Sequence, residues 1–175
     1  MRRTISIFVC LCAVSLSVMA EEITHDFHTD SGKTLAFTGT KIGTYSDGIV
    51  YTCNGSAEFG VRSLGNPICV IIPQNDSVII SPAITGLTEM RITTYYTPTV
   101  TLGVKVSTDS INWVDQGTYS ATTSSQAVVT LSKGNYYVSI KNVTSPSSVA
   151  YVRRMYYLYD PVEDTCDNCF PVVFE

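Results

Sequence analysis

Apolar and polar side chains alternate along several short stretches of the chain, which is the pattern of β-strands with one buried face. The clearest stretch covers residues 100–106 (VTLGVKV), where every second residue is Val or Leu. Another follows at residues 112–119, and the segment between them (STDSI) supplies Ser and Asp side chains that hydrogen-bond nearby backbone groups in tight turns. These segments together predict a β-hairpin.

The same pattern predicts further strands, which are separated by Gly, Pro, Asn, Asp and Ser residues. Their expected ranges are 49–52, 69–72, 78–81, 87–96, 127–131, 136–141 and 149–159. Pro82 is expected to break one run of strand, and residues 132–135 (SKGN) are expected to form a turn because Gly and Asn tolerate positive φ. Eight or nine short strands without a long helical stripe predict an all-β antiparallel β-sandwich, such as a jelly roll.

The first 20 residues carry the pattern of a cleavable signal peptide. Two arginines come first, an apolar stretch follows, and Ala20 precedes two glutamates. The apolar stretch is shorter than the roughly 20 residues of a membrane span. Neither Cys10 nor Cys12 follows the small residue typical of a lipidated cysteine, so we expect a soluble protein that is secreted or periplasmic.

Cleavage after Ala20 leaves 155 residues, enough for one domain with a hydrophobic core. We expect the sandwich to occupy residues 21–160 and residues 161–175 to form a C-terminal tail with a Cys-x-x-Cys motif. Without the two signal arginines the chain has 9 basic and 15 acidic residues, a net charge of −6. This acidity argues against nucleic acid as a partner. No later apolar run is long enough to span a membrane, so we expect no membrane contact after cleavage.

Four cysteines remain after cleavage, namely Cys53, Cys69, Cys166 and Cys169. In an exported protein an even number of cysteines predicts disulfides, and the most local pairing is Cys53 with Cys69 and Cys166 with Cys169. A zinc site is the alternative, although only one pair has the Cys-x-x-Cys spacing. A redox role for that pair is disfavoured because it lies in a tail rather than at the start of a helix.

Residues 77–119 and the strands after them resemble the galactose-binding-like β-sandwich modules of secreted Bacteroidota proteins, including the cleaved-adhesin type. The motifs that carry the resemblance are SPAI at residues 81–84, VSTD at 106–109 with Trp113, YVSI at 137–140, and the last strand at 152–160. The resemblance covers roughly residues 70–160. It implies a module that attaches to carbohydrate or to a neighbouring enzyme, although fold alone does not determine function.

Aromatic side chains are the candidate ligand-binding residues, because the apolar face of a sugar ring stacks on them. Adjacent tyrosines on a strand point to opposite faces, so one of each pair is expected to be exposed. The alternatives are that Trp113 packs under the hairpin and that the tyrosines only stabilise cross-strand pairs. The candidate set consists of Trp113, Tyr95, Tyr137, Arg153, Tyr156 and Tyr157.

The sequence offers little for catalysis. His25 and His28 are the only histidines, and a strand would place them on opposite faces. No nucleophile motif or zinc-protease motif is present. We therefore expect no enzymatic activity, although a pocket that joins either histidine to a carboxylate would favour an enzyme. Asp109 lies in a turn similar to the structural Asp-box hairpin.

No cofactor is expected, and a structural calcium held by Asp26 or Asp30 together with Asp160 is left open, because the chain ends often meet in this fold. The sequence thus predicts a secreted, non-catalytic module that binds a glycan. The alternative is a structural or protein-interaction component of a cell-surface assembly. An exposed groove of Tyr and Arg would favour the former, and a flat apolar patch would favour binding to a cell-surface protein.

Overall fold

The computed structural model describes residues 20–61, 68–95, 99–145 and 148–160. These residues form eleven β-strands, and none of them belongs to a helix that could cross a membrane. In chain order the strands are β1 (Glu21–Asp26), β2 (Leu35–Thr38), β3 (Ile42–Tyr45), β4 (Val50–Asn54), β5 (Glu58–Val61), β6 (Ile68–Ile72), β7 (Ser77–Thr94), β8 (Val100–Ser107), β9 (Val114–Ala121), β10 (Ala127–Asn142) and β11 (Ala150–Tyr159). The all-β antiparallel β-sandwich that the alternating pattern predicts is confirmed.

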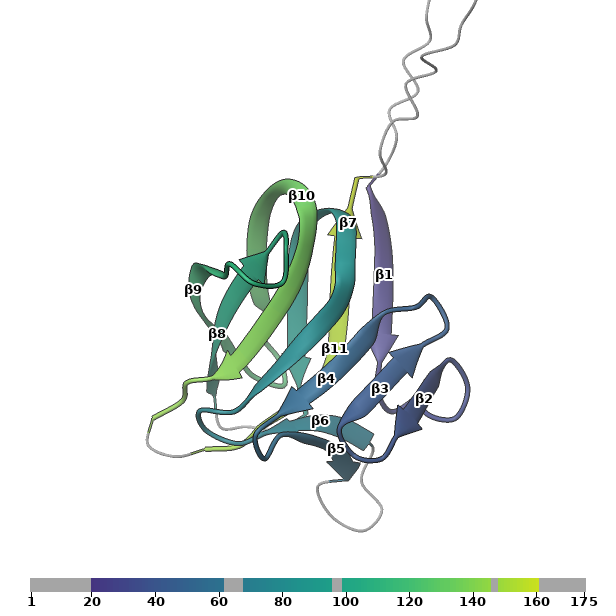
Figure 1. Ribbon diagram of the computed structural model, residues 1–175. Helices are drawn as coiled ribbons and strands as arrows, with labels where there is room; N and C mark the ends of the chain where they lie inside the picture. Colours follow the sequence, from purple (N-terminus) through teal and green to yellow (C-terminus); the bar gives the residue numbers. More distant parts are fainter. Residues whose placement is uncertain (1–19, 62–67, 96–98, 146–147, 161–175) are drawn as a thin grey trace, which may run out of the picture.

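Two long strands, β7 and β10, run through both layers of the sandwich (Figure 1). The first sheet has the order β2-β3-β4-β7-β10-β8-β9 and contains the first part of β7 and the last part of β10. The second sheet contains the other parts of these two strands, followed by β11. Along the edge away from β7, β11 pairs with β1 and, at its beginning, with β6, which in turn pairs with β5.

Two predicted chain breaks are absent because the strands bend where they were expected to end. Pro82 lies within β7, just after the last residue that pairs with β4. Residues 132–135 lie within β10, where the register to β7 shifts repeatedly between Thr130 and Val138. Irregular pairing tolerates a proline and re-aims a strand without ending it. The bends at the two positions carry the antiparallel β7–β10 pair from one layer into the other.

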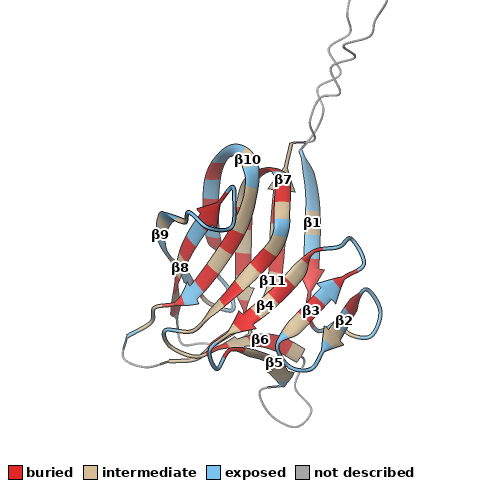
Figure 2. Ribbon diagram, viewed as in Figure 1, coloured by how far each residue is buried: buried red, intermediate tan, exposed pale blue. Residues whose placement is uncertain are grey.

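The core lies between the inner faces of the two sheets, and the strands alternate between buried and more exposed positions (Figure 2). In β8 the inward residues are the Val and Leu residues of the alternating pattern, as predicted. Three strands, β2, β3 and β5, were not predicted, because each has only four residues and two contain glycine. The largest fully buried side chains are Tyr51, Tyr157, Phe27, Leu35, Ile72, Ile80, Leu87, Met90, Ile92, Leu102, Ile140 and Met155.

Candidate functional site

A hollow of about 230 Å³ lies on the outer face of the first sheet, over β8, β9 and β10. We call it the lysine hollow. Gly103 and Gly117 supply no side chain there, and hydroxyl, ammonium and carboxylate groups surround the space. Its lining residues are Ser77, Gly103, Lys105, Asp115, Gly117, Thr118, Ser139, Lys141 and Val143.

The register of the strands explains why these side chains meet. Ser139 is opposite Lys105, and Lys105 is opposite Asp115, so the three form one row across β10, β8 and β9. In the next row Lys141 lies between Ser77 and Gly103. Because successive side chains alternate between faces, residues two apart on one strand point the same way. The two rows therefore face the same solvent space.

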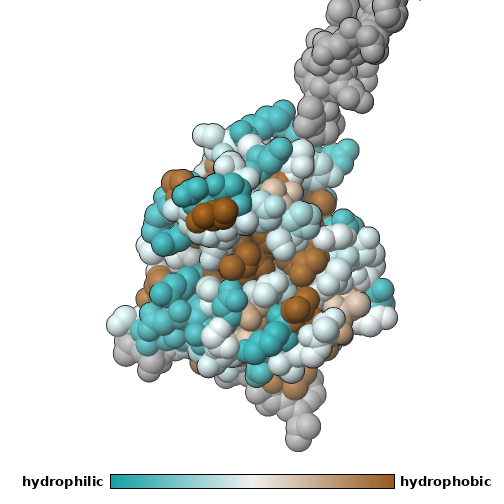
Figure 3. All heavy atoms as spheres, in the orientation of Figure 1, coloured by the Kyte–Doolittle hydropathy of each residue, from teal (hydrophilic) through white to brown (hydrophobic). Residues whose placement is uncertain are grey.

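The two lysines of the hollow lack a carboxylate partner. Within the described residues, neither ammonium group lies within 4 Å of a carboxylate. The lining carboxylate of Asp115 instead accepts a hydrogen bond of 2.7 Å from the backbone amide of Gly117. The lysine hollow thus holds two ammonium groups outside ion-pair distance and one carboxylate, an excess of positive charge, and Figure 3 shows hydrophilic residues over β8 and β10.

Apolar residues gather beside the hollow on the same outer face, over β4 and the adjoining part of β7 (Figure 3). Thr52 pairs with both Ile42 and Ile79 across β3, β4 and β7, and Val50 lies two residues before it. Each of these three apolar side chains is only half-buried. The first sheet therefore has a polar region over its β8–β10 part and an apolar region over its β4 part.

Tyr137 and Trp113 lie beyond one end of the lysine hollow. Tyr137 is opposite Ser107, one row beyond Lys105, and it shares a strand face with Ser139. Trp113 directly precedes β9 and is half-buried rather than part of the core. These two predicted ligand residues are the ones that the fold brings close to the hollow.

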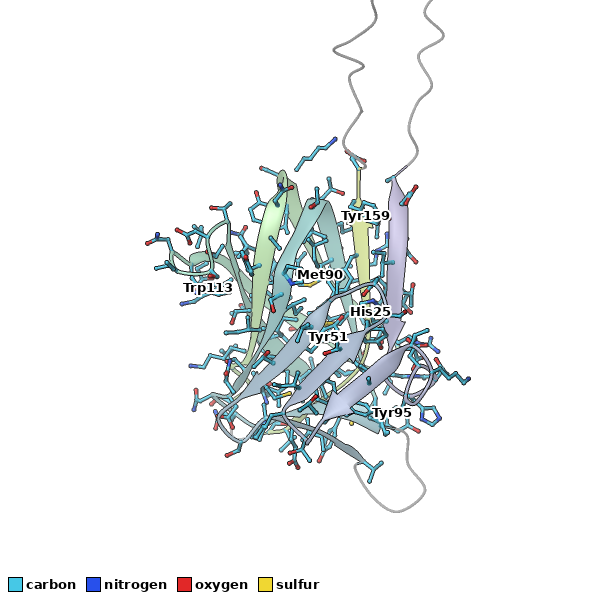
Figure 4. All side chains as sticks on the ribbon, turned by 45° about the vertical axis from the view of Figure 1, so that its right-hand side comes forward. His25, Tyr51, Met90, Tyr95, Trp113 and Tyr159 are labelled. Carbon is cyan, nitrogen blue, oxygen red and sulfur yellow. The ribbon has the colours of Figure 1, made fainter. Side chains whose placement is uncertain are left out.

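The other predicted ligand residues lie elsewhere, so the predicted set does not form one site. Tyr95 and Trp113 are on opposite sides of the molecule (Figure 4). The guanidinium carbon of Arg153 lies 5.8 Å from the centre of the Tyr95 ring, a cation–π contact. Tyr156 is on the outer face of the second sheet, where it lies between Thr24 and Arg91.

Tyr157 was predicted as a ligand contact, and that prediction is wrong because the side chain is fully buried. Tyr156 and Tyr157 point to opposite faces of β11, as expected, and the inward ring is the one at 157. Its hydroxyl lies 2.6 Å from that of Tyr51 and donates to the sulfur of Met155. The side chain therefore belongs to a buried polar chain and cannot reach a ligand in solvent.

The buried polar chain runs from Asp47 through His25 and Tyr51 to Tyr157. His25 Nε2 lies 2.9 Å from an Asp47 oxygen, and Nδ1 lies 2.6 Å from the Tyr51 hydroxyl. The ring of Tyr45 stacks on the His25 ring at a centroid distance of 3.6 Å. Figure 4 shows His25 and Tyr51 within the body of the sandwich, away from Trp113.

A depression of about 270 Å³ beside this chain is lined by His25, Asp30 and Asp47, which is the arrangement that would favour an enzyme. Both ring nitrogens of His25 are already hydrogen-bonded, and the residue is only 2% exposed. Tyr51 is fully buried, so its hydroxyl cannot attack a substrate. A general base must reach the proton that it removes. The geometry therefore fits a structural role for His25 better than a catalytic one.

Burial sets the protonation states in this region. Desolvation lowers the pKa of His25 and outweighs the hydrogen bond and negative charge of Asp47, which act in the opposite direction. Burial would raise the pKa of Asp26, but hydrogen bonds from Arg154 and from the amides of Thr29 and His28 outweigh it, so that pKa is lowered. Near neutral pH, His25 is uncharged and Asp26 is ionised.

The turn before β9 has the structural role expected for an Asp-box-like hairpin. Asp109 Oδ1 accepts hydrogen bonds from the hydroxyl of Ser107 and from the amides of Ile111 and Asn112. These hydrogen bonds, led by the one from the Asn112 amide, hold the pKa of Asp109 far below its usual value. Since both carboxylate oxygens are used within the turn, Asp109 stabilises the hairpin.

The proposed calcium clamp does not fit the fold. β1 and β11 are antiparallel, with Glu21 opposite Tyr159 and Asp26 opposite Arg154, so Asp26 is about 20 Å along the strands from Asp160. Asp30 accepts a hydrogen bond from the Asp26 amide and lies at the same far end. Within the described ranges, no group of three His, Cys, Asp or Glu residues could hold a metal ion.

The predicted Cys53–Cys69 bridge is not formed. Cys53 lies on β4, which pairs with β3 and β7, whereas Cys69 lies on β6, which pairs with β5 and β11. A disulfide needs close and favourably directed Cβ atoms, which closeness in sequence does not supply. Burial raises the pKa of the Cys53 thiol to about 12. The signal peptide and the predicted Cys166–Cys169 pair lie outside the described residues.

Lys105 and Lys141 were not predicted as site residues. Each occupies a polar position of an alternating strand, so the sequence could have indicated that both face solvent. Their closeness depends on the register between β8 and β10, which the sequence pattern does not specify.

No family model and no curated protein matches the sequence. The fold is similar to the CBM36-1 domain of a multidomain xylanase from the hindgut metagenome of Trinervitermes trinervoides, with 13% identity, a TM-score of 0.40, and coverage of 78% of this chain and 96% of the other. It is also similar to Arthrobacter globiformis T6 isomalto-dextranase complexed with panose, with 16% identity, a TM-score of 0.41 and coverage of 80% of this chain. The chain spans 33% of that enzyme. Both TM-scores are below 0.5, so function has to be inferred from this chain's own residues.

Proposed function

We propose that this protein is an exported, non-catalytic module that binds carbohydrate in the lysine hollow. The observation that carries the proposal is the hollow itself, in which three hydroxyl side chains, one carboxylate and two ammonium groups surround a space of about 230 Å³. Sugars present hydroxyl groups that both donate and accept hydrogen bonds. The lining offers partners of both kinds, since a carboxylate accepts, an ammonium donates and a Ser or Thr hydroxyl does either.

The size of the hollow favours a sugar over a larger ligand. Pockets for drug-sized ligands enclose about 300–1,000 Å³, so a space of about 230 Å³ suits one sugar unit of a chain that continues across the surface. Tyr137 lies beyond one end, where an aromatic ring offers a stacking surface for a further unit.

The proposal includes export, because residues 1–20 are expected to form a signal peptide. It also includes membership of the galactose-binding-like, cleaved-adhesin-type modules. A cell-surface protein is the alternative partner. The observation that favours it is the half-buried apolar region beside the hollow, around Ile42, Val50 and Ile79. A partner protein docked there would bury apolar area, whereas a glycan would use the polar side.

The test is binding of the purified protein to a panel of soluble and insoluble polysaccharides, by affinity electrophoresis and pull-down. Tyr137→Ala and Ser139→Ala remove one aromatic and one hydroxyl contact on the proposed face. Tyr156→Ala is the matched control, because it removes an outward tyrosine from the opposite sheet. We expect weaker binding for the first two variants and unchanged binding for the third.

The proposal fails if no polysaccharide binds, and the apolar region then becomes the leading candidate, with a protein as its partner. If Tyr156→Ala abolishes binding while Tyr137→Ala does not, the assignment of the binding site to the lysine hollow is wrong. In that case the outer face of the second sheet, with Arg91 and Arg154 beside Tyr156, would be the binding face.

A further inference from the structure

We infer that the glycan bound in the lysine hollow carries an anionic group, either a uronate carboxylate or a sulfate ester. This inference rests on the proposed function and narrows it to acidic saccharides. It follows from how the chain distributes its positive charges, and from the place where two of them are left without a partner.

The two lysines are neighbours on one face. Lys105 is opposite Ser139, and Lys141 is opposite Gly103, so the lysines occupy diagonal positions on the adjacent strands β8 and β10. Diagonal positions on neighbouring strands are about 7–8 Å apart, within reach of long side chains. Gly103 has no side chain to fill the space between them. Two ammonium groups can therefore approach one anionic group in the hollow.

Most other cations of the described residues are already engaged. Arg91, Arg153 and Arg154 lie within 4 Å of carboxylates, and so does Lys133. Lys41 donates to the carbonyl oxygens of Gly55 and Ala57. Of the eight described Lys and Arg residues, only Lys33, Lys105 and Lys141 have a side chain with neither kind of partner, and two of these three line the hollow.

The acidic character of the whole protein makes this arrangement more significant. Acidic residues outnumber basic ones by 15 to 11, yet the hollow has two lysines and a single carboxylate. That carboxylate, Asp115, is held by the amide of Gly117 and remains able to accept from a sugar hydroxyl. A neutral sugar would leave the excess positive charge of the hollow in place, whereas a carboxylate or sulfate would accept charge-assisted hydrogen bonds from the two ammonium groups.

The experiment compares glycans that differ only in charge. One pair is polygalacturonate and its fully methyl-esterified form, and the other pair is dextran sulfate and dextran. Each is titrated against the wild-type protein, a Lys105→Gln/Lys141→Gln variant, and a Lys33→Gln/Lys133→Gln control that removes the same total charge elsewhere. Melting temperatures check that all three proteins fold.

We expect the wild-type protein to bind a charged form at least about tenfold more tightly than its neutral partner, since only the charged form accepts charge-assisted hydrogen bonds from the two ammonium groups. The hollow variant loses that preference, and the control variant keeps it. The pair that shows the preference identifies the anionic group as a carboxylate or a sulfate.

Three outcomes would overturn the inference. Equal affinity for the charged and neutral forms, unchanged in the hollow variant, would leave the proposed glycan function intact but remove the acidic specificity. An equal loss in the hollow variant and the control would indicate general charge attraction instead of a site. Failure of every polysaccharide to bind would reject the proposed function, and the inference with it.

Discussion

Replacement of Tyr51 by Phe tests the buried polar chain most directly, because the Tyr51 hydroxyl is its central link. That hydroxyl lies 2.6 Å from His25 Nδ1 and 2.6 Å from the Tyr157 hydroxyl, and all three residues are essentially excluded from solvent. The substitution removes one oxygen atom and leaves the ring in place. It therefore isolates the hydrogen bonds from the packing of the aromatic side chain.

The expected cost can be worked from the partners that are left behind. A buried hydrogen bond contributes about 1 kcal/mol, and a buried polar group left without a partner costs about 1–3 kcal/mol. Tyr51→Phe breaks two bonds and leaves His25 Nδ1 unpaired, while Tyr157 retains the Met155 sulfur. We expect a loss of about 2–4 kcal/mol. Tyr157→Phe removes the bond to Tyr51, which keeps His25, and the weaker bond to the Met155 sulfur, and it should cost about 1 kcal/mol.

Urea denaturation followed by fluorescence measures both variants, with the m-value as a check that the unfolding transition is unchanged. The double variant should be little less stable than Tyr51→Phe alone, because Tyr157 then has no hydroxyl partner left to lose. If Tyr51→Phe were within about 0.5 kcal/mol of the wild type, or if the two single losses simply added, the chain would not be a connected network.

Three further predictions follow from the same structure. Because the pKa of His25 is lowered in the folded state, its contribution to stability is complete above about pH 6.5 and is lost as the pH falls below that value. In denaturation measured from pH 8 to 5, a His25→Gln variant should lack this loss of stability, whereas His28→Gln, at an exposed position, should retain it. A wild-type stability that does not change over this range would contradict the lowered pKa of His25. Gly43→Ala should destabilise the protein by about 1–3 kcal/mol, because its Cβ would lie 2.6 Å from the Phe59 ring. Gly39 has a positive φ and no atom within 4 Å of the position that a Cβ would take, so Gly39→Ser tests the cost of backbone conformation without a close contact. Equal stability of Gly43→Ala and the wild type would show that the Phe59 ring can move. Asn142→Leu should cost about 2–4 kcal/mol, since the fully buried amide donates to the carbonyl oxygens of Ile72 and Ser148 and accepts from the Thr144 amide. Thermal unfolding measures the loss of stability. A variant as stable as the wild type would mean that these backbone groups find other partners.

The sequence indicated where most strands lie and which of their side chains face inward. Period-2 alternation is a local property, and for β8 it identified the four inward apolar residues without any knowledge of the partner strands. The turn chemistry of Asp109 was equally local, because its hydrogen-bond partners lie within three residues. Features of this kind depend on neighbours along the chain and can be recognised there.

The local pattern misled where the meaning of a residue depended on a distant strand. Pro82 and residues 132–135 have the composition of chain breaks, yet each lies in a bent strand whose irregular pairing was not visible in the sequence. The Cys53–Cys69 bridge failed for a related reason. Two cysteines that are close in sequence were carried to strands that do not pair with each other.

The candidate site was decided by the tertiary structure alone. The sequence established that Tyr156 and Tyr157 face opposite ways, but only the packing of β11 against the other layer determined which ring is buried. Likewise, Lys105 and Lys141 each occupy a polar position of a predictable strand. Their diagonal placement follows from the β8–β10 register, and register is fixed by the packing of whole sheets rather than by either strand alone.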